Sequence, residues 1–225
     1  PATSTKYPTL SGVAQYNTSE IGIAAPDGLD KYWSPIGGTN YTIDNDQSCI
    51  SVTQSGTEGF FFGPCSPYGG SLVANVAMAL NLNMDFKDGA ADFGYMLILK
   101  GEQANPVWAL GRGIAMMVFP DAITLTKVVN SETVVLATYH GSLQSGKNYN
   151  VEFIAKDHSD GTTDAWIVIK DENGNLLTEN EGSEVTLGVT GITGVAGEGY
   201  VTMFANGGVL SGYRFGTGAF TDTIP

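Results

Sequence analysis

The most regular pattern in this chain is an alternation of apolar and polar residues with a period of two. One face of the segment 76–86 is entirely apolar: Val76, Met78, Leu80, Leu82, Met84 and Phe86. The other face is small and polar: Ala77, Ala79, Asn81, Asn83 and Asp85. A helix would scatter both sets around its circumference, and only an extended strand separates them. The pattern predicts a strand with one face in a core and a polar face with room for a ligand.

Shorter runs of the same kind extend along the chain. Further strands are predicted at 41–43, 49–54, 60–62, 93–100, 114–119, 123–129, 133–140, 149–156, 165–170, 200–204 and 212–215. The 93–100 run is apolar on both faces, which is typical of a central strand. Hairpin turns are predicted at 130–132 and at Asn173-Gly174, a strong hairpin signal. Pro35, Gly37 and Gly38 predict a turn after Trp33.

At least ten short strands separated by turns predict an all-β fold, a two-sheet antiparallel β-sandwich. The chain has 225 residues, 42% of them hydrophobic, and 30 glycines. This length suits a single sandwich domain over 1–225 in which residues 1–12 form an extended lead-in. Long patterns of helical period are missing, and so is any run of about 20 apolar residues that could span a membrane.

The charge balance is strongly acidic. Lys and Arg total 10 against 23 Asp and Glu, a formal net charge of −13. Such a surface repels phosphate backbones and anionic lipid headgroups, which argues against nucleic acid and membranes as partners. A polyanionic substrate is disfavoured for the same reason.

Several features point to a secreted, processed protein. The chain starts at Pro1 with neither Met nor a signal peptide, and glycosylation sequons stand at Asn17 and Asn40. Cys49 and Cys65 are expected to form a disulfide that closes a short loop, and the alternative is two buried free thiols.

The second half of the chain resembles the concanavalin A-like lectin/glucanase superfamily, and most of all its laminin-G-like members. The resemblance is carried by segments 113–116, 123–127, 134–137, 146–153, 166–177, 199–201 and 213–215. It implies a jelly-roll sandwich with one concave and one convex sheet. Members of the superfamily bind glycans, hydrolyse them, cleave uronic acid polymers or hold other proteins, so the resemblance narrows the class of ligand and leaves the chemistry open.

Carbohydrate binding on the concave sheet is the leading hypothesis. Sugar hydroxyls pair with amides and carboxylates, and sugar C–H faces stack on aromatic rings. The candidate binding residues are Asn81, Asn83 and Asp85 on one strand, together with the aromatic residues Trp33, Tyr68 and Trp108. Trp166 is expected to lie in the core, and ordinary packing remains the alternative for each of the aromatics.

A polysaccharide-degrading enzyme is the main alternative. A retaining hydrolase needs two carboxylates about 5–5.5 Å apart, and the E-x-D-x-E strand that carries them in the superfamily is missing. A β-eliminating lyase needs a charge-neutralising group, a base and an acid. Gln103, Arg112, His140 and Tyr200 supply these residue types, although the lyase motifs R-T-E and Q-I-H are absent. A third possibility is an adhesive or structural module without a sugar site.

Calcium is common in the superfamily, which makes Ca²⁺ a candidate cofactor. Asp44 and Asp46 offer oxygen ligands of the right hardness. A second acidic run, at 171–175, is explained by the hairpin turn that contains it.

Overall fold

The structure is a computed structural model of the chain. It describes side chains at residues 42, 51, 81–84, 94–102, 111–141, 143–177, 187–200 and 202, and the backbone of the remaining strands. The described part of the chain contains no helix with the length and apolarity needed to cross a membrane.

Strands dominate the described residues. They are β1 Thr9–Leu10, β2 Tyr16–Asn17, β3 Trp33–Gly37, β4 Tyr41–Asp44, β5 Cys49–Val52, β6 Phe60–Pro64, β7 Val76–Asn83, β8 Tyr95–Gly101, β9 Gly113–Val118, β10 Ala122–Val129, β11 Glu132–His140, β12 Asn148–Asp157, β13 Thr163–Lys170, β14 Leu187–Ile192, β15 Tyr200–Ala205, β16 Gly208–Thr217 and β17 Phe220–Thr221.

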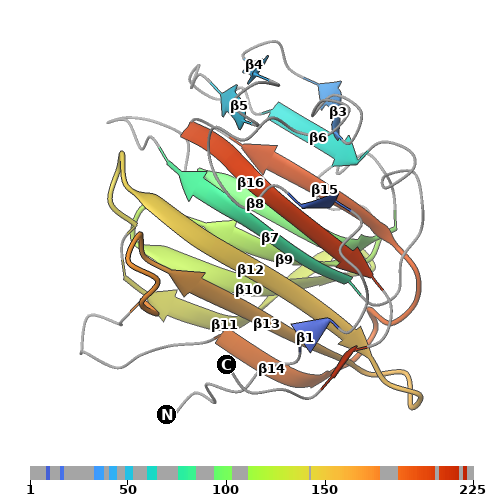
Figure 1. Ribbon diagram of the computed structural model, residues 1–225. Coiled ribbons are helices and arrows are strands. Elements are labelled where there is room, and N and C mark those ends of the chain that lie inside the picture. The colour runs from blue at the N-terminus through green and yellow to red at the C-terminus, as the bar shows by residue number, and fades with distance from the viewer. Residues whose placement is uncertain are drawn as a thin grey trace.

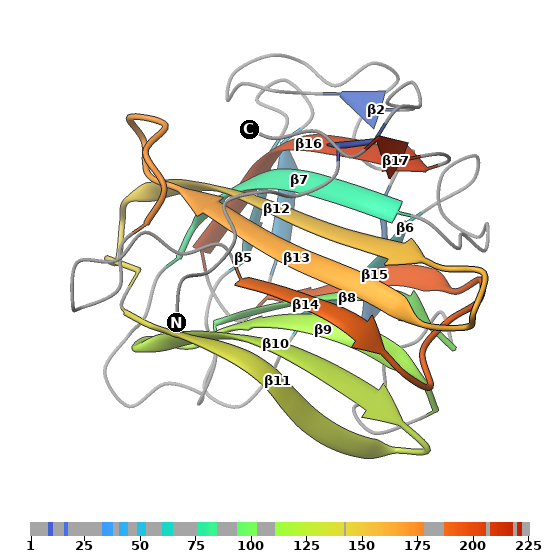
Figure 2. The same cartoon turned by 90° about the horizontal axis from the view of Figure 1, so that it is seen from below.

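Two antiparallel sheets pack face to face (Figures 1 and 2). The seven-stranded sheet has the order β11-β10-β9-β8-β15-β6-β3. The eight-stranded sheet has the order β14-β13-β12-β7-β16-β5-β4, with β2 paired to β16 outside this path. A separate short pair joins β1 to β17. This arrangement confirms the predicted all-β, two-sheet antiparallel jelly-roll sandwich.

The core lies between the two sheets and is built by alternation along each strand. On β12, Tyr149, Val151, Phe153 and Ala155 are buried and face the other sheet, whereas Asn150 is exposed. On β7, Leu82 and Met84 are buried, whereas Asn81 and Asn83 are only half-buried. β8 is buried along nearly its whole length and lies in the interior of its sheet, as its apolar sequence predicted.

Hairpin turns occur where the sequence placed them. Asn130 and Ser131 join β10 to β11 with φ values of 50° and 66°, the left-handed geometry of a tight hairpin turn. After β13 the chain turns through Asn173 and Gly174, whose φ is 80°, and Leu176 pairs back onto Lys170.

Two local predictions are corrected. The strand predicted to reach Phe86 ends at Asn83. The turn predicted over Pro35 and Gly37 is wrong, since both residues belong to β3. Proline is tolerated there because β3 is an edge strand that pairs only with β6, and the register shifts between Pro35 and Gly37.

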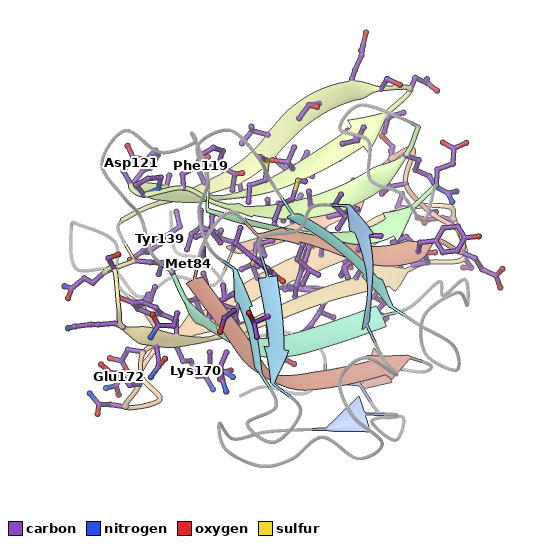
Figure 3. All side chains as sticks on the ribbon, turned by 90° about the horizontal axis from the view of Figure 1, so that it is seen from above. Met84, Phe119, Asp121, Tyr139, Lys170 and Glu172 are labelled. Carbon is purple, nitrogen blue, oxygen red and sulfur yellow. The ribbon has the colours of Figure 1, made fainter. Side chains whose placement is uncertain are left out.

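The strands run between two opposite ends of the sandwich, here called the Asn83 end and the Lys100 end. Among the described residues, 84, 94, 119–122, 141, 143–147 and 171–175 belong to the Asn83 end. Residues 101–102, 111–113, 129–132, 157–163 and 193–199 belong to the Lys100 end. Figure 3 shows the labelled side chains Met84, Phe119, Asp121, Tyr139, Lys170 and Glu172 gathered on one side of the molecule, the Asn83 end.

Candidate functional site

The outward face of the eight-stranded sheet carries four asparagines on two neighbouring strands, here called the amide ladder: Asn81, Asn83, Asn148 and Asn150. The antiparallel register sets Asn81 opposite Asn150 and Asn83 opposite Asn148. Asn150 Nδ2 donates to Asn81 Oδ1 at 3.0 Å. Asn83 Nδ2 donates to Asn148 Oδ1 at 2.9 Å and to the Gly146 carbonyl at 3.2 Å.

Strand alternation puts these amides on the surface. Leu82 and Met84 point into the core, so the residues beside them point outward. Each asparagine side chain has two N–H donors and two acceptor lone pairs, and the bonds within the ladder use only part of that capacity. The amide ladder is therefore a flat polar surface able to bond to hydroxyl groups.

Charges of both signs border the amide ladder. Lys170 on β13 lies opposite Asn150, and Glu152 follows Asn150 on the same face. Figure 3 shows Lys170 and Glu172 projecting from the Asn83 end. A surface with mixed charges creates no strong field of one sign, which suits an uncharged ligand.

The structure corrects the expectation that Trp166 lies in the core. Ala165 and Ile167 face inward, so Trp166 between them faces outward, half-buried, on the same side of the sheet as the amide ladder. Together with Leu176, it covers the outward side chains Ile154 and Val168, which are 0% and 2% exposed. The alternation could not reveal this face, because residues 165–169 are apolar at every position.

Among the described lyase candidates, the structure separates His140 from Tyr200 and Arg112. His140 is exposed at the Asn83 end, where it pairs with Ala122. Tyr200 pairs with Gly101 at the Lys100 end, near Arg112. The two ends are about 20 Å apart, at roughly 3.3 Å per strand residue. No proton could pass directly between His140 and Tyr200 over that distance.

Arg112 has a structural role at the Lys100 end. Its guanidinium donates to the carbonyl of Ala196 at 3.0 Å and to that of Glu198 at 2.6 Å. These bonds hold the segment that leads into β15.

A buried ion pair beside Arg112 was not anticipated from the sequence. Lys100 is 0% exposed, and its Nζ donates to Asp157 Oδ2 at 2.8 Å and to the Gly197 carbonyl at 2.6 Å. Asp157 also accepts from Thr163 Oγ1 at 2.7 Å and from Gly197 N at 2.8 Å. Burial lowers the pKa of Lys100, and the bond to Asp157 partly offsets that shift. The pair joins β8 of one sheet to β12 of the other.

The described residues do not form a metal site. Among them no group of three or more His, Cys, Asp or Glu side chains could hold an ion. The carboxylate of Asp171 accepts the backbone N–H of Asn173 at 2.9 Å and of Asn175 at 3.0 Å, so it serves the hairpin turn. The calcium candidates Asp44, which ends β4, and Asp46 have side chains outside the described residues.

Other candidates fall wholly or partly outside the described residues. Outside lie Asp85, Gln103, Trp108, Tyr68, Cys65 and Asn40. Trp33, Cys49 and Asn17 belong to strands whose side chains are not described. The sequence did not identify Asn148 and Asn150 as site residues. Their alternation with apolar residues predicted a strand, but nothing in the sequence indicated that this strand pairs with β7.

No family model matches this chain, and no curated protein matches its sequence significantly. Solved structures do match its fold. The carbohydrate binding module CBM66 from Bacillus subtilis aligns with a TM-score of 0.52 and 12% identity over 83% of this chain and 93% of that one. The metal-free carbohydrate recognition domain of Emp46p aligns with a TM-score of 0.62 and 10% identity over 93% of this chain and 100% of that one.

A third match is the exoplasmic/lumenal domain of VIP36 in its Ca²⁺/Man-bound form, with a TM-score of 0.58 and 12% identity over 86% of each chain. At such low identities these similarities establish the architecture only. The chain therefore shares the β-sandwich fold of these solved domains, which is the architecture that its sequence resemblance implied.

Proposed function

We propose that this protein is a secreted carbohydrate-binding protein that holds a glycan on the outward face of β7 and β12. The observation that carries the proposal is the amide ladder, four asparagine side chains aligned on one surface. The structural neighbours named as a carbohydrate binding module and a carbohydrate recognition domain support the ligand class.

The chemistry of the amide ladder fits sugars. A pyranose presents several hydroxyls, each both donor and acceptor, and amides can answer both roles without ionising. The net charge of −13 and the mixed charges around Asn150 favour a neutral glycan over a uronate polymer.

Binding to an array of neutral gluco-, manno- and xylo-oligosaccharides tests the proposal. The double variant Asn81→Ala/Asn150→Ala removes one rung of the ladder from the surface. We expect its affinity to fall about tenfold or more, since each lost sugar hydrogen bond contributes on the order of 1 kcal/mol. The control is Val135→Ala, at a 57% exposed position on β11 in the other sheet.

Retained binding by the double variant, with the fold intact by circular dichroism, would place the glycan elsewhere. Absence of binding to the whole array, both with calcium and with a chelator, would refute glycan binding altogether. Incubation with uronic polymers tests the lyase alternative, since unsaturated products that disappear in His140→Ala would reveal an enzyme.

The secreted character has its own test. Intact-mass measurement of the protein from its native source would detect glycans on Asn17 and Asn40 and the loss of two hydrogens on forming a Cys49–Cys65 disulfide. A mass without either change would contradict secretion through an oxidising compartment.

A further inference from the structure

We propose that Trp166 is an aromatic stacking residue of the glycan site, and that the site takes an extended chain of several sugars rather than a single terminal sugar. This inference rests on the proposed function and adds to it a second contact and a ligand length.

The register places Trp166 in line with the amide ladder. Trp166 lies opposite Ile154, which is four residues beyond Asn150 on β12 and on the same face. Four strand residues correspond to about 13 Å along the sheet. A glycan that touches both Asn150 and Trp166 must therefore be longer than one sugar ring.

The register gives the residues between the two contacts. On β7 it sets Ala79 opposite Glu152 and Ala77 opposite Ile154. On β13 Val168 lies next to Glu152 and is 2% exposed, because Trp166 and Leu176 pack against the pair Ile154 and Val168. Among the described residues of this face, the indole of Trp166 is the bulkiest apolar group, about 13 Å along the sheet from the row of Asn150.

Gly188 fixes the indole in its position. A Cβ added to this glycine would lie 2.8 Å from Trp166 Cδ1 and 3.1 Å from Nε1, so the ring rests directly beside the β14 backbone. Ile154 and Val168 support it from below. A ring held in this way gives a preformed apolar surface, and sugar binding would cost it little conformational entropy.

Stacking is favoured over a purely structural role because Trp166 is not fully buried. Ile154 and Val168, against which it packs, are 0% and 2% exposed, whereas Trp166 is half-buried on the outward face. Aromatic surfaces of this kind are suited to the C–H faces of sugars. Trp166→Ala should lower the stability of the fold whether the indole stacks on a sugar or only packs against Ile154 and Val168. The two roles are therefore distinguished by how the loss of affinity depends on ligand length.

The experiment measures binding of manno-, gluco- and xylo-oligosaccharides from monosaccharide to hexasaccharide by titration calorimetry. For the series that binds, we expect affinity to rise with length and then level off. Trp166→Ala should reduce hexasaccharide affinity about tenfold. It should leave the shortest binding member nearly unchanged, because that member reaches only the amide ladder.

Two further variants keep the test independent of folding. Trp166→Phe preserves a ring over Ile154 and should lose less affinity than Trp166→Ala. Gly188→Ala keeps the indole but displaces it, so it should weaken hexasaccharide binding and spare the shortest ligand. In the native protein the hexasaccharide should change tryptophan fluorescence, and Trp166→Phe should abolish most of that change.

The outcomes distinguish the extended-chain site at Trp166 from glycan binding in general. Binding with no length dependence, or equal losses for short and long ligands in Trp166→Ala, would overturn the extended-chain site and leave glycan binding standing. Absence of binding by the native protein to every series would refute both.

Discussion

At the scale of single residues, Lys100 stands out because a charged side chain sits where no water reaches it. Its partners Asp157 and Gly197 belong to different segments, so one ammonium group joins β8, β12 and the segment before β15. Lys100 also has a φ of 59°, a left-handed conformation that is unusual for a residue with a side chain. Gly199 lies so close that a Cβ there would come within 2.3 Å of the Lys100 carbonyl carbon.

Replacing Lys100 with Met should lower the free energy of unfolding by about 3 kcal/mol at neutral pH, because Asp157 would keep a buried charge without its cation. Urea denaturation followed by tryptophan fluorescence measures this loss. The isosteric double variant Lys100→Met/Asp157→Leu is the control and should recover part of it.

The pH dependence should carry a definite sign. The folded pKa of Lys100 is below its ordinary value of 10.5, so in the window between the two values the unfolded chain binds more protons. Stability contributed by this residue therefore rises as pH increases through that window. The unfolding free energy of the native protein should therefore rise relative to that of Lys100→Met as the pH increases toward 10.5, the ordinary pKa of lysine. Parallel profiles would contradict this account.

At the scale of elements, the alternation of residues predicts where a strand lies and which of its faces is buried. It does not predict which other strands pair with it. Period-two alternation predicted that Leu82 faces the core and Asn81 the surface, because alternation is a property of one strand alone. Pairing of Asn81 with Asn150 depends on contacts between residues distant in the chain, and no local pattern encodes it. His140 and Tyr200 were grouped by residue type, although His140 is the last residue of β11, at the Asn83 end, and Tyr200 is the first residue of β15, at the Lys100 end.

The turn between β10 and β11 gives a prediction at this scale. Ser131 has a φ of 66°, which costs energy for any residue with a Cβ. Ser131→Gly should therefore raise the free energy of unfolding by about 0.5 kcal/mol, and Ser131→Val should lower it. Thermal denaturation monitored by circular dichroism measures both changes, and a lower midpoint for Ser131→Gly would show that this turn geometry is not strained.

At the scale of the whole molecule, the acidic surface and the neutral candidate site predict how binding responds to salt. A net charge of −13 repels anionic polymers but exerts no net force on an uncharged glycan. Raising NaCl from about 50 mM to about 500 mM should thus change the affinity for a neutral oligosaccharide less than twofold. A steep loss of affinity measured by calorimetry would indicate that charged groups such as Lys170 carry the binding.

The two ends of the sandwich carry different groups, so the loops at one end could evolve independently of the other. The Asn83 end bears the amide ladder, whereas at the opposite end Lys100 and Asp157 fasten the two sheets together and Arg112 holds the segment that leads into β15. Segments 141–147 and 171–175 can therefore be lengthened or exchanged without disturbing that fastening. Loops at the Asn83 end could therefore evolve toward new ligands, while the ion pair at the Lys100 end continues to hold the two sheets together.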